Sequence, residues 1–123
     1  MVRKSFTPAQ ANRTLPLVRR IVEDLLASGR ELQKVSQRPN DPGAIERAGA
    51  LDLRIRELQL ELERIGCSYK GWGFDMGLVD FPGLIAGENV LLCWRSDEPA
   101  VVWYHSAEGG FAGRKPIPEE QLE

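Results

Sequence analysis

The chain has 123 residues, of which 42% are hydrophobic and 28% charged, and its net charge is −2. This length and composition predict a single folded domain, residues 1–123, and exclude a mainly disordered chain. The lack of a basic excess argues against a general nucleic-acid binder.

The two cysteines, Cys67 and Cys93, are too few for a disulfide scaffold or a paired-cysteine zinc site. We therefore expect reduced thiols in the cytoplasm. The basic N-terminal residues are not followed by the apolar stretch of a signal peptide, and no apolar run approaches the length of about 20 residues that a membrane helix needs. The sequence thus predicts a cytoplasmic protein that binds neither membranes nor nucleic acid.

A helix start is predicted at the N-terminus, where Thr7, Pro8 and Gln10 fit the N-cap and the first and third helical positions of a capping box. Pro16 lacks an N–H donor and clashes with the preceding turn. We therefore predict a short helix over 8–13, a break, and a second helix over about 16–36. Gly29 lies on the apolar stripe of that second helix, which favours a close approach by another helix.

The next helix is predicted to start at Asp41 and Pro42 and to end at a C-cap, Gly66. Its apolar residues alternate steps of four and three, as in a coiled-coil seam of about three heptads. They are Ala44, Ala48, Leu51, Ile55, Leu58, Leu62 and Ile65. The short loop and matched lengths of about 30 Å predict an antiparallel helical hairpin over residues 6–66.

After Gly66 the pattern becomes that of β-strands. Strands are predicted at 67–70, at 77–81 (stopped by Pro82), at 90–95 and at 100–105, with a last edge segment over 111–117 and a frayed tail over 118–123. The loop 71–74 carries Trp72 and Phe74, which either cover the core or form a recognition surface. The fold class is α+β: a helical hairpin followed by an antiparallel β-meander of three to four strands over 67–117.

Several short motifs together resemble a bacterial family known only as a domain of unknown function. They are Phe6-Thr7, Ala11-Asn12, Leu15-Pro16, Gly77-Leu78-Val79-Asp80-Phe81-Pro82, Leu92-Cys93-Trp94-Arg95, Glu98-Pro99, Trp103-Tyr104-His105 and Gly110-Phe111-Ala112-Gly113-Arg114. The resemblance covers nearly the whole chain. It implies a bacterial cytoplasmic protein and brings no activity with it.

Three residues are the candidates for a ligand or anion site: Asp80, His105 and Arg114. Asp80 lies in an apolar strand and needs a partner, which Arg114 offers as a bidentate guanidinium. His105 is the single histidine, and it is either a general base or metal ligand or a partly buried residue bonded to backbone. Glu98 is expected to be solvated.

A zinc site made of Cys67, Cys93, Asp80 and His105 has suitable donors, but strand geometry argues against it. If residues 96–99 form a four-residue loop, Cys93 and His105 face opposite sides of the sheet, whereas a one-residue register change reverses this. We therefore predict no metal, no catalytic residues and no cofactor. The glycine-rich segment 109–114 lacks the spacing of a phosphate loop.

Leu17, Leu53 and Leu60 add apolar positions to the hairpin beyond its main seams. Uncovered apolar surface of this kind is typical of association. The sequence therefore favours a non-enzymatic protein-interaction module that forms a homodimer or higher homo-oligomer through the hairpin. The alternative is an enzyme or a small-ligand protein that uses Asp80, His105 and Arg114.

Overall fold

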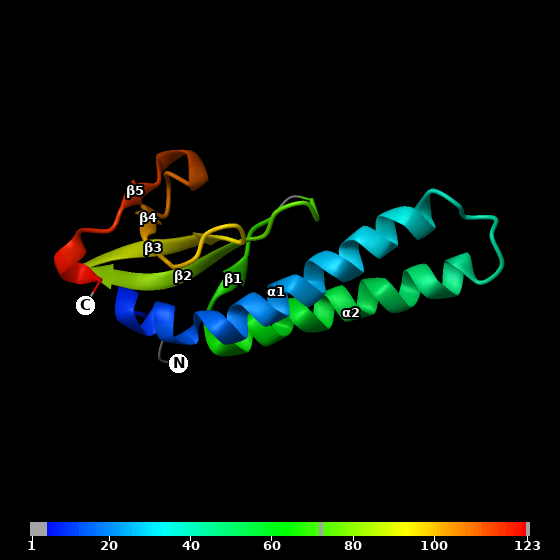
Figure 1. The fold of residues 1–123 in the computed structure, drawn as a ribbon, viewed down its shortest axis with the longest axis horizontal. Helices are drawn as coiled ribbons and strands as arrows, with labels where there is room; N and C mark the ends of the chain where they lie inside the picture. The colour runs from blue at the N-terminus through cyan, green and yellow to red at the C-terminus, as the bar shows by residue number, and fades with distance from the viewer. Residues whose placement is uncertain (1–4, 72, 123) are drawn as a thin grey trace.

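The computed structural model describes residues 5–71 and 73–122, in which two packed helices are followed by a five-stranded antiparallel sheet. The helices α1 (Pro8–Ser36) and α2 (Ala44–Ile65) form a hairpin that extends well beyond the sheet (Figure 1). The predicted α+β class and the helical hairpin are confirmed. Trp72 lies outside the described residues.

Helix α1 is continuous from Pro8 to Ser36, so the predicted break before Pro16 and the separate N-terminal helix are wrong. The predicted capping box is present: Gln10 N donates to Thr7 Oγ1 at 3.1 Å, and Thr7 N donates to Gln10 Oε1 at 3.0 Å. Proline costs a helix about 3 kcal/mol. The helix continues because the apolar stripe on either side of Pro16 is buried as one surface. That stripe consists of Ala11, Leu15, Val18, Val22 and Leu25.

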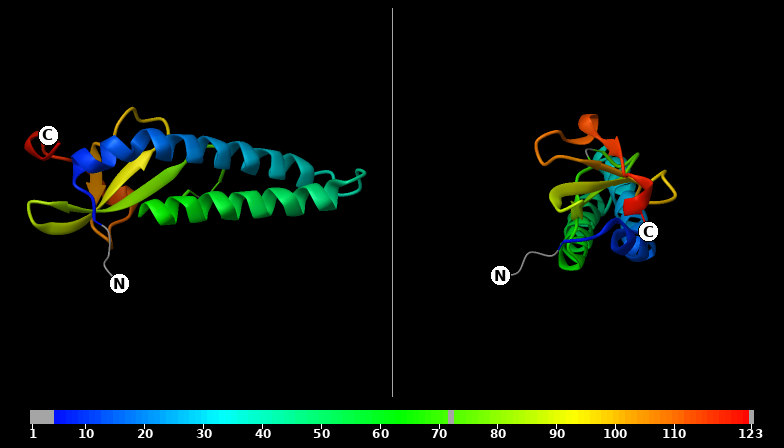
Figure 2. Two further views of the ribbon diagram at one scale, coloured as in Figure 1. Left: turned by 90° about the horizontal axis from the view of Figure 1, so that it is seen from below. Right: turned by 90° about the vertical axis from the view of Figure 1, so that its left-hand side faces the viewer.

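Helix α2 begins after Gly43, two residues later than the predicted Asp41–Pro42 start, and Gly43 has φ 78°. The predicted C-cap Gly66 is confirmed, with φ 114°. The two helices run antiparallel (Figure 2). An ion pair between Arg47 and Glu31, at 2.6 Å, joins them near the loop. Most of the predicted seam is buried between them, at Ala44, Leu51, Ile55, Leu58 and Leu62.

The sheet is a meander whose strands follow one another in chain order, which confirms the predicted topology with more strands than the expected three to four. Its strands are β1 (Ser68–Tyr69), β2 (Leu78–Ile85), β3 (Glu88–Arg95), β4 (Trp103–His105) and β5 (Lys115–Pro116). Strands β2 and β3 join through a two-residue turn in which Ala86 and Gly87 both have positive φ, 50° and 81°. This is the turn geometry that matches the twist of a hairpin.

Strand β2 runs through Pro82, where the sequence predicted a stop. The carbonyl of Pro82 accepts from Phe6 N at 2.7 Å, and Leu84 N donates to Phe6 O at 3.1 Å. The backbone N and O of one residue point to the same side of a strand, so the missing N–H of Pro82 lies on the side away from β3. Proline is tolerated there because no ladder bond to β3 is lost.

Strand β4 is shorter than predicted and its register is shifted by one residue. Cys93 pairs with Trp103, whereas a loop over 96–99 predicts pairing with Val102. The side chain of Asn12 holds the backbone of Val101, accepting from its N at 2.7 Å and donating to its O at 3.0 Å. Val101 therefore bonds to α1 and Val102 to Ile117, and the connection between β3 and β4 gains a residue.

One face of the sheet packs on the helices, and the other is open (Figure 2). The covered face holds the core residues Val79, Phe81, Leu92 and Trp94, all fully buried. Phe74 packs against the same core, over Gly29, so it covers the core as one of the two predicted alternatives had it. The close neighbour of Gly29 is thus the Phe74 ring and not the second helix.

The segment after β4 is mostly not a strand. The 3₁₀ helix η1 (Phe111–Gly113) precedes the two-residue β5, and the 3₁₀ helix η2 (Glu119–Gln121) follows it. Leu122 packs against the core, so the tail folds back onto the domain instead of fraying. No helix in the part of the chain that the structure describes combines the length and apolar character of a membrane span.

Candidate functional site

Three polar or ionisable side chains meet on the open face of the sheet, at the level where β2, β3 and β4 lie side by side. Asp80 pairs directly with Cys93 across β2 and β3, and His105 lies two residues beyond the partner of Cys93 on β4. One donor atom from each lies within 4.8 Å of those of the other two. The predicted placement of Cys93 and His105 on opposite faces is therefore wrong, and the reason is the one-residue register shift.

All three side chains are nearly inaccessible to solvent, with exposed fractions of 7% for Asp80, 2% for Cys93 and 4% for His105. Ionised groups at this depth are costly unless they are paired. His105 Nε2 lies 3.1 Å from Asp80 Oδ1. Asp80 was predicted to need a partner, and His105 is that partner. The predicted Asp80–Arg114 salt bridge is wrong.

The second ring nitrogen of His105 fixes where its proton lies. Nδ1 is 2.7 Å from the carbonyl oxygen of Ser106. A carbonyl oxygen only accepts, so Nδ1 must carry hydrogen. Nε2 then faces an Asp80 oxygen with its lone pair unless a second proton or a cation lies between them.

Burial and, after it, the neighbouring Asp80 carboxylate together raise the pKa of the Cys93 thiol to about 12, while Arg114 acts in the opposite direction. Cys93 is therefore a neutral thiol at neutral pH in the absence of a bound cation. A thiol in this state is a poor nucleophile, which argues against a Cys93–His105 nucleophilic pair.

The trio is part of the lining of a hollow of about 670 Å³ on the open face. Its walls come from β1, the flanking strands and the loop before η1, with Lys70, Leu78, Leu91 and Phe111 among the lining residues. A site of this size and composition is typical of small-ligand pockets. The contributions of Lys70 and Phe111 were not predicted, because nothing in the spacing of the sequence places either residue opposite Asp80.

Arg114 lies beside this hollow, and its guanidinium is bonded to other residues of the protein. Its guanidinium pairs with both oxygens of Glu98 at 2.8 and 2.9 Å and donates to the Cys93 carbonyl at 3.3 Å. It also stacks on the rings of Trp103 and Phe111, 4.8 and 4.7 Å from their centroids. Glu98 is thus a partly buried partner and not a solvated residue as predicted. Arg114 supports the wall of the site.

The other cysteine is separated from the trio. Cys67 is buried in the core cluster, and its thiol donates to the Leu62 carbonyl with an Sγ–O distance of 3.4 Å. It is not a member of the cluster of potential metal ligands found among the described residues. The four-residue zinc set considered from the sequence thus reduces to Asp80, Cys93 and His105.

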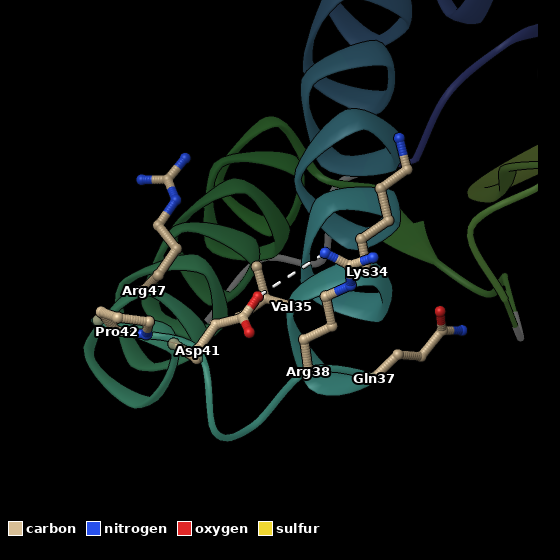
Figure 3. A pocket seen from close by; sticks show the side chains of 9 residues that line it. Lys34, Val35, Gln37, Arg38, Asp41, Pro42 and Arg47 are labelled. Atoms are coloured by element: carbon tan, nitrogen blue, oxygen red, sulfur yellow. Dashed lines mark ion pairs between the residues drawn. The ribbon is translucent and has the colours of Figure 1, made fainter.

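A second hollow, of about 570 Å³, lies at the tip of the helical hairpin (Figure 3). Its charged residues are exposed, and three of them form ion pairs: Arg38 lies 4.0 Å from Asp41, and Arg47 pairs with Glu31 outside the hollow. Side chains that are solvated and paired in this way carry little binding energy. The sheet-face hollow, with its buried donors, is the better candidate for a functional site.

Residues 4–117 match a family described as uncharacterized conserved protein (DUF2203), so the match covers nearly the whole chain. This confirms the resemblance drawn from the sequence motifs. No curated protein and no solved structure matches the chain.

Proposed function

The chain belongs to the DUF2203 family of uncharacterized conserved proteins, and we propose that it binds one divalent transition-metal ion through Asp80, Cys93 and His105. The proposal depends on the meeting of the three donors within 4.8 Å of one another. In addition, Nδ1 of His105 bonds to a backbone carbonyl. That second hydrogen bond is the usual arrangement in which a histidine presents its other nitrogen to a metal.

The donor set indicates the class of ion. A thiolate and an imidazole suit zinc and its borderline neighbours, whereas magnesium and calcium prefer oxygen ligands. In a tetrahedral zinc site the donors lie about 3.3–3.6 Å apart. The three donor atoms lie within 4.8 Å of one another, so binding a metal would draw them closer together.

Charge also supports the proposal. A dication between Asp80 and Cys93 favours the carboxylate and the thiolate, so that two negative ligands neutralise the metal charge in a buried site. The expectation of no metal depended on Cys93 and His105 facing opposite sides of the sheet. With that premise removed, the same three residues favour binding.

The direct test is titration of the purified protein with Zn²⁺ and with Co²⁺. We expect one ion per chain, and a sulfur-to-cobalt charge-transfer absorption that Cys93→Ser abolishes. Cys67→Ala is the matched control, because this cysteine is equally buried but lies in the core, and the absorption should persist. Absence of metal binding by the wild-type protein, or retention of the absorption in Cys93→Ser, would overturn the proposal.

A second candidate function is self-association through the hairpin, which the exposure of its apolar residues favours. Leu17, Leu53 and Leu60 are 54%, 61% and 48% exposed. Leu53 and Leu60 are seven residues apart in α2 and so lie on the same side of the helix. A symmetric dimer that pairs two hairpins into a four-helix arrangement would bury this surface.

Light scattering at micromolar concentration tests this second function, with an expected mass of twice 13.8 kDa. The double variant Leu53→Lys, Leu60→Lys should give the mass of a single chain. Leu84→Lys, at an exposed apolar position on the sheet, should leave the dimer intact. A single-chain mass for the wild-type protein at every concentration would contradict the dimer.

A further inference from the structure

The protein supplies three metal donors in the described part of the chain, and the hollow supplies open space in front of them. Structural zinc sites close all four positions with protein ligands, whereas sites that act on a ligand keep one position open. A metal bound by Asp80, Cys93 and His105 would therefore have its fourth coordination position toward the hollow. The chemistry of the walls decides which ligand can occupy that position.

The walls combine one cation with apolar side chains. Lys70 is the single basic residue among the described lining residues, on the edge contributed by β1. Leu78 and Leu91 each lie two residues from a proposed ligand, Leu78 from Asp80 on β2 and Leu91 from Cys93 on β3. They share the open face because side chains alternate along a strand. Phe111 completes the wall and is held between the guanidinium groups of Arg95 and Arg114.

We infer that this hollow binds a small monocarboxylate, with its carboxylate on the metal near Lys70 and its apolar chain against Leu78, Leu91 and Phe111. The inference rests on the proposed metal function. Two anionic protein ligands already neutralise a divalent ion, and one lysine matches one further negative charge. A phosphate group would bring more charge and more acceptor oxygens than one lysine and apolar walls can satisfy.

The size of the hollow fits this class of ligand. At about 670 Å³ it lies within the range of pockets that enclose small organic molecules and exceeds the needs of a single water or inorganic anion. Each methylene group placed against the apolar wall contributes at most about 0.8 kcal/mol. Affinity should therefore rise by up to about fourfold per added methylene until the hollow is filled.

The experiment uses the Co²⁺-loaded protein and follows the visible cobalt absorption while acetate, butyrate, hexanoate or inorganic phosphate is added. We expect carboxylates to change the spectrum, with affinity in the order hexanoate, butyrate, acetate. Lys70→Gln should weaken all three carboxylates severalfold. Lys115→Gln, an exposed lysine outside the hollow, should not. Phe111→Ala should reduce the dependence on chain length.

The outcomes separate this inference from the proposed function. If cobalt binds but no carboxylate changes the spectrum, or if acetate and hexanoate bind equally, the carboxylate inference fails and metal binding stands. Preference for phosphate over every carboxylate would also overturn it. If no cobalt absorption forms, the metal function fails and the carboxylate inference fails with it.

Discussion

The guanidinium of Arg114 donates to both carboxylate oxygens of Glu98, which joins the turn after β3 to the segment that leads into β5. Each side chain is only 12% exposed. The same guanidinium donates to the carbonyl of Cys93, so the pair connects the wall of the hollow to the strand beneath the proposed metal.

Arg114→Met should therefore destabilise the protein by about 3 kcal/mol, because it leaves the Glu98 carboxylate buried without its cation. Asp97→Asn is the matched control in the same turn. It removes an ion pair with Arg95 whose members are 38% and 45% exposed, and it should change stability by less than about 1 kcal/mol. Chemical denaturation measures both, and equal losses would contradict the buried role of the Arg114–Glu98 pair.

The Asp80–His105 pair should behave as a coupled unit in the metal-free protein. With a chelator present, Asp80→Ala and His105→Ala should each cost about 3 kcal/mol, because each leaves a buried polar partner unsatisfied. The double variant should lose less than the sum of the two. Strictly additive losses in urea denaturation would mean that the two side chains do not stabilise one another.

Two glycines inside helices should respond oppositely to alanine. A Cβ on Gly29 would lie 1.9 Å from the Phe74 ring, whereas one on Gly49 meets nothing within 4 Å. Gly49→Ala should stabilise the protein by up to about 1 kcal/mol through helix propensity. Gly29→Ala should destabilise it, because the ring must leave the core, and Phe74→Ala should relieve that clash. A stabilising Gly29→Ala would show that Phe74 does not pack there.

Cys93 should make stability fall at alkaline pH. Its thiol pKa is raised to about 12 by burial first and by Asp80 second, with Glu98 adding and Arg114 opposing, while His105 faces it from β4. An unfolded cysteine titrates near about pH 8.5. A raised folded pKa means that the stabilisation is fully present below about pH 8.5 and is lost as the pH rises toward the folded value.

Between about pH 8 and about pH 10 the free energy of unfolding should drop by about 1–2 kcal/mol from this group. Cys93→Ala should show a smaller drop than the wild-type protein, measured by denaturation at each pH with a chelator present. Identical pH dependence in the Cys93→Ala variant would contradict the raised pKa.

The helices and the strand order follow from local sequence, and these were predictable. The spacing of Leu51, Ile55, Leu58 and Leu62 defines the buried side of α2, and Gly66 ends it. Local rules failed where tertiary contacts overrode them. Pro16 stays within α1 because its flanking stripe is buried as one surface, and Pro82 stays within β2 because Phe6 occupies that edge.

Two members of the candidate site, Asp80 and His105, were named from the sequence, whereas Cys93 was expected to lie apart from His105. Asp80, His105 and Arg114 were identified by residue type, and all three lie in or beside the hollow. The pairing of Asp80 with His105 depends on the one-residue register shift of β4. Shortly before that strand, Val101 N donates to the side chain of Asn12. No local pattern links Asn12 with Val101, which are 89 positions apart. The spacing of the sequence therefore could not predict that Cys93 lies near His105. It also could not predict that Arg114 pairs with Glu98.

The hydrogen bonds between Asn12 and Val101 also set an order for folding during synthesis. The helical hairpin is complete within the first 66 residues and contains its own apolar contacts. The segment that leads into β4 docks on α1 through the hydrogen bonds between Asn12 and Val101. Asn12 is synthesised 89 residues before Val101. The three donors therefore come together only after β4 has been synthesised and has docked beside β3.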